Sequence, residues 1–326
     1  MMNSTWKAGV AAGCIALLGA ALAGAQDWPQ WRGPNRDGKA AGFTAPKDWP
    51  KELTKKWSIP VGDGVATPAL VGDKLYVFSR QSGNEIIRCL DTGNGKEIWH
   101  DKYESGEAPR MAAQFSGPRS SPAVADGKVV TLGVKGIVSC YDAASGKKLW
   151  RKTDSAEYRP MFDTASSPLI VDGKAVVQLG GERSGVVIAY DLASGEQKWK
   201  WAEDSTTYSS PAVMTMGDAK VIVVQTNANV AGLDPADGKL LWQTPFPGLG
   251  RMSYHAATPV VDGQTVIFSD NRTSAVKVEK QGDKVGAKEM WNARSTTNTR
   301  RAQMTPNIRK RGQSVGTGVQ LSSFGR

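Results

Sequence analysis

Four segments decide the fold of this chain: DTGNGKEIW at 91–99, DAASGKKLW at 142–150, DLASGEQKW at 191–199 and DPADGKLLW at 234–242. In each segment an Asp lies eight residues before a Trp and a Gly lies four residues before it. The tryptophans of these segments are 43 to 51 residues apart, a spacing typical of a repeat protein. Three anchor residues that recur in register therefore indicate a chain built from similar units.

Each unit contains four short segments that read as β-strands. A Thr-Pro or Ser-Pro pair lies 28 to 32 residues before each tryptophan, as in Ser121-Pro122. Alternating apolar stretches such as KLYVFS at 74–79 and IIRCLD at 86–91 follow and predict strands. Pairs such as Asp126-Gly127 suit the tight hairpin turns between them, because they tolerate positive φ. Four antiparallel strands in about 40 to 50 residues are the blade of a β-propeller.

We expect the repeated residues to be structural. A tryptophan between adjacent blades buries a large apolar surface, and this packing is a better explanation of its recurrence than ligand stacking. An Asp side chain can begin a turn, and a Gly accepts the left-handed conformation that ends it. Trp57 resembles the outer strand of a further blade. The structural residues are Trp99, Trp150, Trp199, Trp242 and Trp291, with Asp91, Asp142, Asp191, Asp234, Gly95, Gly146, Gly195 and Gly238.

The N-terminus has the pattern of a secretory signal peptide. Lys7 precedes an apolar stretch from about Ala8 to Ala23, and small residues end it at Ala25. Cleavage after Ala25 predicts a periplasmic or secreted protein with no transmembrane segment after cleavage. A membrane anchor is less consistent with so short a stretch. Lipidation at Cys14 is a further alternative.

The formal net charge of +10 is concentrated at the C-terminus. Residues 292–326 contain seven basic residues and no Asp or Glu, whereas residues 26–291 contain 33 basic and 31 acidic residues. The whole protein therefore does not have the charge of a nucleic-acid-binding protein. Four parts are expected: a signal peptide (1–25), an extended N-terminal strap (26–56), a β-propeller (57–291) and a basic tail (292–326).

Alternatives remain open for two of these parts. The strap could cross the propeller or reach another protein. We expect the tail to be disordered or aberrant, as in a truncated or frame-shifted sequence. It could also be a degraded sixth blade beginning at Thr305-Pro306, or a basic interaction tail.

The repeat, together with DWPQWRGPNRDG at 27–38, resembles the pyrroloquinoline-quinone (PQQ) repeat propellers of secreted bacterial proteins. These include quinoprotein dehydrogenases and the propeller subunit of the outer-membrane assembly machinery. The resemblance covers about 27–291. It implies an all-β ring of seven or eight four-stranded blades, of which five complete blades are recognisable here. PQQ with calcium is a possible cofactor by this resemblance alone.

Two features depart from the quinoprotein dehydrogenases. They carry a vicinal Cys-Cys pair and a calcium site with clustered Glu, Asn and Asp, and neither pattern occurs in this sequence. Cys89 and Cys140 occupy equivalent third-strand positions in different units, too far apart for a disulfide. We expect buried thiols, with a redox or metal role as the alternative.

A binding site is expected at the axial funnel, in the loops that precede each Ser-Pro or Thr-Pro pair. Several arginines that converge there would favour an anionic or carboxylate ligand. Alternatively, these side chains bond neighbouring loops. No nucleophile–base pair or metal-ligand cluster is recognisable, so no catalytic residue and no metal ligand are assigned. The candidates are Arg110, Gln114, Arg119, Arg159, Asp163, Tyr208, Arg251, Tyr254 and His255.

The sequence thus favours an exported, non-catalytic β-propeller that acts as a binding or assembly module in the periplasm. Its expected partner is an envelope protein or a small polar ligand. The alternative is a PQQ-dependent oxidoreductase that binds the quinone in the axial funnel. A third hypothesis, binding of nucleic acid or anionic lipid, rests only on Arg309, Lys310, Arg311 and their neighbours, and no nucleic-acid partner is expected.

Overall fold

The computed structural model describes most of the chain between Asp27 and Arg294, and a short C-terminal segment. The described residues are 27–106, 116–153, 158, 160, 162–181, 184–248, 254–270, 272–282, 284–294 and 319–325. All regular secondary structure in these ranges is β-strand. The all-β prediction is therefore confirmed.

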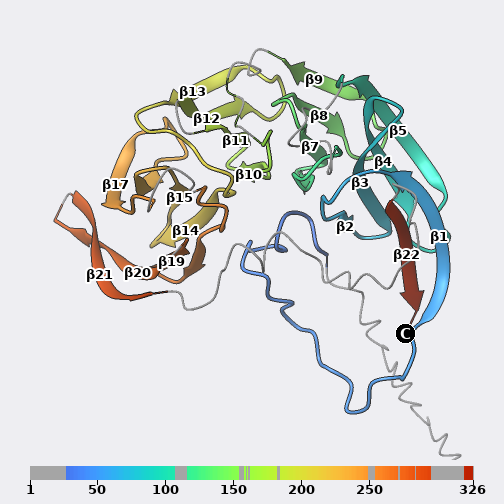
Figure 1. The fold of residues 1–326 in the computed structure, drawn as a ribbon, viewed down its shortest axis with the longest axis horizontal. Coiled ribbons are helices and arrows are strands. Elements are labelled where there is room, and N and C mark those ends of the chain that lie inside the picture. Colours follow the sequence, from blue (N-terminus) through green and yellow to red (C-terminus); the bar gives the residue numbers. More distant parts are fainter. Residues whose placement is uncertain are drawn as a thin grey trace, which may run out of the picture.

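Five four-stranded antiparallel sheets follow one another along an arc (Figure 1). Within each sheet the strand order equals the chain order, so each unit is a meander and each sheet is one propeller blade. The blades are β2–β5 (Ala69–Val71, Lys74–Gln81, Asn84–Asp91, Glu97–Glu104), β6–β9 (Ala123–Ala125, Lys128–Leu132, Val138–Asp142, Lys148–Lys152), β10–β13 (Leu169–Val171, Lys174–Gly181, Ser184–Asp191, Gln197–Trp201), β14–β17 (Ala212–Met216, Ala219–Gln225, Asn229–Leu233, Leu240–Pro245) and β18–β21 (Val260–Asp262, Thr265–Ser269, Arg272–Gln281, Lys284–Arg294). We number them blades 1 to 5 in this order.

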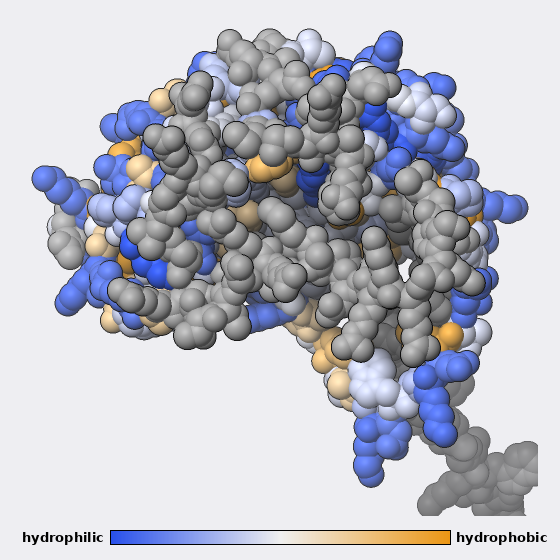
Figure 2. All heavy atoms as spheres, viewed as in Figure 1, coloured by the Kyte–Doolittle hydropathy of each residue, from blue (hydrophilic) through white to orange (hydrophobic). Residues whose placement is uncertain are grey.

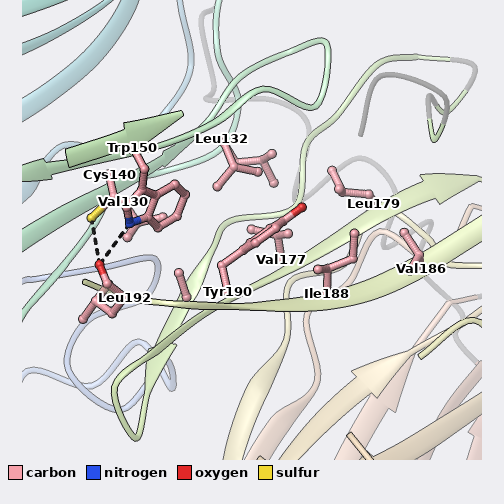
Figure 3. Packing of buried hydrophobic residues seen from close by; sticks show 12 residues of the cluster. Val130, Leu132, Cys140, Trp150, Val177, Leu179, Val186, Ile188, Tyr190 and Leu192 are labelled. Atoms are coloured by element: carbon pink, nitrogen blue, oxygen red, sulfur yellow. Dashed lines mark hydrogen bonds between the residues drawn. The ribbon is translucent and has the colours of Figure 1, made fainter. Parts of the chain in front are cut away.

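The hydrophobic core lies between blades. The two middle strands of a blade are buried on both faces, as in β11 and β12, whereas the outer strand β5 alternates between exposed and half-buried residues. Between blades 2 and 3, for example, Trp150 and Cys140 pack against Tyr190 and Leu192 of the next blade (Figure 3). A blade therefore buries its faces only by packing against its neighbours.

Four of the repeated tryptophans dock on a turn of the blade that follows them. Each indole N–H donates to the carbonyl of the residue after the repeated Asp. The ring covers the repeated Gly, and a Cβ built at Gly146 would lie 2.5 Å from Trp99. Four such bonds join successive units: Trp57 to Thr92 O (2.8 Å), Trp99 to Ala143 O (3.1 Å), Trp150 to Leu192 O (3.1 Å) and Trp199 to Pro235 O (3.0 Å).

The repeated Asp and Gly shape the turn that receives the ring. The Oδ1 atom of Asp142 accepts from the backbone N–H of Ser145 at 2.8 Å, and Gly146 N–H donates to Asp142 O at 2.9 Å. Gly146 has a φ of +71°, which an L side chain rarely adopts. The turn is therefore built by its own residues, and its glycine leaves the space for the indole.

This docking pattern is absent from the described part of blade 5. A long hairpin of β20 and β21 replaces the Asp-to-Gly turn. The indole N–H of Trp242, on β17 of blade 4, is buried and makes no hydrogen bond to the described residues. Trp291, on β21, is 43% exposed. Within the described part of the chain, Trp291 therefore does not pack between two blades, unlike the four docked tryptophans and in contrast to what its place in the repeat predicted.

The C-terminal segment contains a strand that the sequence did not predict. Val319–Gly325 forms β22 and pairs antiparallel with β1 (Thr54–Gly62), which precedes blade 1. This pairing is possible because an edge strand such as β1 offers unpaired backbone N–H and C=O groups to a segment that extends beside it. The expectation that residues 292–326 form a disordered or aberrant tail stays a prediction.

Substitution of the docking glycine tests the importance of the indole contact. We expect Gly146→Ala to destabilise the fold by about 3 kcal/mol, because the new Cβ combines an unfavourable positive φ with a collision with Trp99. Gly127→Ala is the matched control, since Gly127 has a φ of +67° but no heavy atom within 4 Å of a Cβ. It should cost only about 1 kcal/mol. Urea unfolding of the two variants measures the difference, and equal losses would contradict the docking argument.

Candidate functional site

The inner ends of the five blades are joined by a ladder of hydroxyl groups. In blades 2 to 5 the Ser or Thr of the Ser-Pro or Thr-Pro pair accepts a hydrogen bond from the backbone N–H of the equivalent residue in the preceding blade. In the sequence this pair served only to mark the repeat. The ladder consists of four bonds: Thr67 N to Ser121 Oγ (3.1 Å), Ser121 N to Ser167 Oγ (3.0 Å), Ser167 N to Ser210 Oγ (2.9 Å) and Ser210 N to Thr258 Oγ1 (3.2 Å).

The N-terminal segment 27–38 lies against the inner ends of four blades. Trp28 forms a β-bridge with Leu70 of blade 1, and Pro29 O accepts from Val124 N–H of blade 2 at 2.8 Å. Trp31 Nε1 donates to Thr258 Oγ1 of blade 5 at 3.1 Å. Blade 3 is reached by Arg36. The DWPQWRGPNRDG motif therefore crosses from blade to blade at the axis.

Arg36 is buried at the inner end of blade 3. We call the region where segment 27–38 meets the inner ends of the blades the inner mouth. The Arg36 side chain donates to Pro168 O at 2.8 Å, to Ser167 O at 3.1 Å and to Gln30 Oε1 at 3.0 Å, and the residue is 2% exposed. Burial, and then the nearby charge of Arg32, lower the pKa of its guanidinium to about 9. Arg36 was not among the site residues predicted from the sequence, because its motif was assigned to the strap. The two arginines in WRGPNR, at positions 32 and 36, are the sequence feature that could have indicated it.

Four loops from four blades bring their side chains together beside this mouth. The cluster consists of Arg119, Phe162, Tyr208 and Tyr254, which precede the first strands of blades 2, 3, 4 and 5. Arg119 Nη1 donates to Phe162 O at 2.7 Å, and Phe162 N–H donates to the hydroxyl of Tyr208 at 3.0 Å. We call these four residues the aromatic–arginine cluster.

The rings of the cluster contact one another by their edges. The centroids of Phe162 and Tyr254 are 5.2 Å apart, and those of Tyr208 and Tyr254 are 5.9 Å apart, both near-perpendicular. All four cluster residues are half-buried. The sequence selected three of them, and Phe162 was missed because a lone Phe in a loop carries no polar signal.

Burial lowers the pKa of Arg119, and the charge of Asp163 opposes that shift. Asp163 is 2% exposed and has a φ of +61°. It is therefore a buried charge close enough to act on Arg119.

His255 lies in a buried polar network and not on the funnel surface. It is 1% exposed, and its Nδ1 atom is 2.9 Å from Gln225 Nε2 and 3.9 Å from Asp270 Oδ2. Gln225 O in turn accepts from Thr207 Oγ1 at 2.8 Å, so the network joins the loops of blades 4 and 5. The bonds to neighbouring loops account for His255 in the described structure. Arg110, Gln114, Arg159 and Arg251 lie outside the described residues.

The residues described here do not fit a calcium–quinone site. Within the described ranges no group of three or more His, Cys, Asp or Glu side chains could hold a metal ion. Cys89 on β4 and Cys140 on β8 are both buried and free. Burial raises the pKa of Cys89 to about 11 and that of Cys140 to about 12. Neither thiol is placed to act on a ligand at the axial mouth.

Comparison with known proteins connects the chain to one family. The sequence profile of the family described as outer membrane protein assembly factor BamB matches residues 83–307. The BamB protein of Yersinia pestis is 26% identical over 246 residues, which are 67% of this chain and 56% of that protein. The BamB protein of Xanthomonas campestris pv. campestris is 27% identical over 285 residues, which are 81% of this chain and 66% of that protein.

Dehydrogenases share a shorter region. The 1-butanol dehydrogenase (cytochrome c) of Thauera butanivorans is 29% identical over 139 residues, which are 42% of this chain but 20% of that protein. The crystal structure of quinohemoprotein alcohol dehydrogenase from Comamonas testosteroni superposes with a TM-score of 0.60 at 19% identity, and covers 81% of this chain and 49% of its own. This likeness shows the propeller fold.

The chain therefore spans only part of the length of these relatives. The described part of the chain contains no helix long and apolar enough to cross a membrane.

Thiol accessibility tests the interpretation of the two cysteines. At about pH 8 we expect Cys89 and Cys140 to react with Ellman's reagent at least roughly 100-fold more slowly in the native protein than in the unfolded chain, because only the thiolate reacts and burial suppresses it. The same protein in guanidinium chloride is the control. Fast reaction of either thiol in the native state would instead support a redox role.

Proposed function

This chain belongs to the family of outer membrane protein assembly factor BamB, and from that membership we propose that it is a binding and assembly propeller of the bacterial envelope. The signal-peptide pattern that ends at Ala25 supports an extracytoplasmic location. Its partner would be an envelope protein, held by the loops at the inner mouth of the arc.

The aromatic–arginine cluster is the observation that carries this proposal. Tyrosine and arginine are enriched among the residues that dominate binding energy at protein interfaces. Here two tyrosines, a phenylalanine and an arginine come from four separate loops and remain half-buried. An apolar side chain of a partner could pack on the rings, while its carboxylate or carbonyl group could accept from the guanidinium.

The loops support binding because their side chains are already ordered by internal bonds. Arg119 is fixed to Phe162 O and Tyr208 to Phe162 N–H, at 2.7 and 3.0 Å. A partner that meets ordered side chains pays less conformational entropy on binding. Beneath them, the hydroxyl ladder and the N-terminal segment hold the blades at a constant separation.

Photo-crosslinking in the native envelope tests the location of the partner. A photoreactive phenylalanine analogue at position 208 or 254 should give a reproducible crosslinked species. The same analogue at the exposed positions 98 and 149, on the outer strands of blades 1 and 2, should give little. We expect Arg119→Ala to reduce the crosslink about tenfold or more, because the cluster would lose its charged anchor.

Two results would contradict this proposal. One is a crosslink of equal yield from the outer positions 98 and 149, and the other is no crosslink from any of the four positions. The Arg119→Ala protein is checked by thermal unfolding, so that a loss of folding is distinguished from a loss of binding.

The second candidate is a PQQ-dependent oxidoreductase, and the similarity to 1-butanol dehydrogenase supports it. The described residues contain no cluster of side chains that could hold the calcium ion of a calcium–quinone site. We therefore expect the purified protein to bind no PQQ at tens of micromolar in the presence of calcium. Titration with PQQ, followed by quinone absorbance and dye-linked alcohol oxidation, measures this. The apo form of the Comamonas testosteroni enzyme serves as the positive control. Quinone binding with alcohol oxidation would favour the oxidoreductase.

A further inference from the structure

Residues 39–56 form an arm: residues 39–53 stand away from the blades, and the last three residues, 54–56, begin β1. Every residue of this segment is exposed, whereas the segments at its two ends are held. On one side Gly38 N–H donates to Arg32 O at 2.8 Å, and on the other side Trp57 docks on blade 1. The arm thus leaves the arc between the inner mouth and β1 (Figure 1).

Large apolar side chains of the arm face solvent. Phe43 is 52% exposed, Trp49 is 63% exposed and Leu53 is 52% exposed, and none of them belongs to a core cluster between blades. The rings of Phe43 and Trp49 contact each other, with centroids 6.3 Å apart. Three such side chains within eleven residues are more than the single exposed apolar residues that any soluble surface carries.

Lysines surround these apolar residues. The arm contains five lysines and two acidic residues, and the hydropathy surface shows charged and apolar groups together on this protruding segment (Figure 2). The structure shows no ion pair for these lysines among the described residues. A segment with aromatic rings and free cationic chains matches the chemistry of a bilayer interface with anionic headgroups. The lysines are Lys39, Lys47, Lys51, Lys55 and Lys56.

We propose that the arm is a peripheral contact with an anionic membrane surface. Phe43, Trp49 and Leu53 would enter the headgroup region, and the lysines would lie against lipid phosphates. A membrane fits better than an acidic groove of a protein because residues 39–53 form no helix or strand that would give a groove a fixed register. A fluid surface requires only apolar side chains flanked by cations.

Such a contact would concentrate the propeller at an envelope membrane independently of what its loops bind. The site is distinct from the aromatic–arginine cluster, so either can be removed without the other. The arm and the C-terminal basic residues are also separable by substitution.

Cosedimentation with lipid vesicles tests the arm. We expect the exported, purified protein to bind vesicles of phosphatidylcholine with phosphatidylglycerol and to bind pure phosphatidylcholine vesicles weakly, with binding reduced by salt. The double variant Phe43→Ala/Trp49→Ala should bind the anionic vesicles roughly tenfold more weakly. Its control is Ile98→Ala/Leu149→Ala, which removes two exposed apolar side chains from outer strands and should bind like the wild type.

A charge-matched pair separates the arm from general electrostatics. Lys47→Glu/Lys51→Glu should lose binding. Lys147→Glu/Lys148→Glu, at the start of β9 and the residue before it, changes the net charge equally and should retain most of the binding. Replacement of Arg309, Lys310 and Arg311 by glutamine should also retain binding. Thermal unfolding confirms that the variants fold.

Three outcomes would overturn the proposal. The wild type could fail to bind anionic vesicles, as expected if the arm instead meets an acidic protein. The two aromatic substitutions could leave binding unchanged. Finally, the tail substitutions alone could abolish binding, which would assign the lipid contact to the C-terminus.

Discussion

The structure depends on one repeated contact, the indole ring of a tryptophan against the glycine of the next blade's turn, which occurs at Gly95, Gly146, Gly195 and Gly238. The ring is apolar and needs a flat surface without a Cβ, while its N–H needs a carbonyl within the same small area. The Asp-to-Gly turn offers both, since Asp142 orders the turn and Gly146 opens it to Trp99. Because blades 1 to 3 both donate a tryptophan and present a turn, the contact propagates along the arc as far as blade 4, as expected for a repeat protein.

A second set of bonds holds the opposite ends of the blades. Hydroxyl groups of the Ser-Pro and Thr-Pro pairs join the inner strands, and segment 27–38 crosses them with Arg36 at its centre. Blades tied at both their outer and inner ends have little freedom to tilt. Loops that enter the inner strands can then keep Arg119 and Tyr208 in place, which is what a binding surface on this fold requires.

Much of the architecture was predictable from the sequence because it rests on local, repeated patterns. Alternating apolar residues gave the strands, and the spacing from Asp91 to Trp99 identified the turn and the docking residue. The site was less predictable. Three members of the aromatic–arginine cluster were selected from their loops, but Phe162 and Arg36 were not, because their roles arise from contacts with distant residues. His255 was selected and is instead buried beside Gln225.

The sequence by itself determined the blade, its order of strands and the residues that join one blade to the next, because each unit repeats the same local chemistry. Tertiary structure alone decided which side chains meet at the axis. Arg36 reaches Pro168 across 132 residues and Arg119 reaches Phe162 across 43, and no local pattern encodes such a pairing. It also decided which tryptophans dock: Trp242 and Trp199 look alike in sequence, but among the described residues only Trp199 finds a carbonyl in the blade that follows.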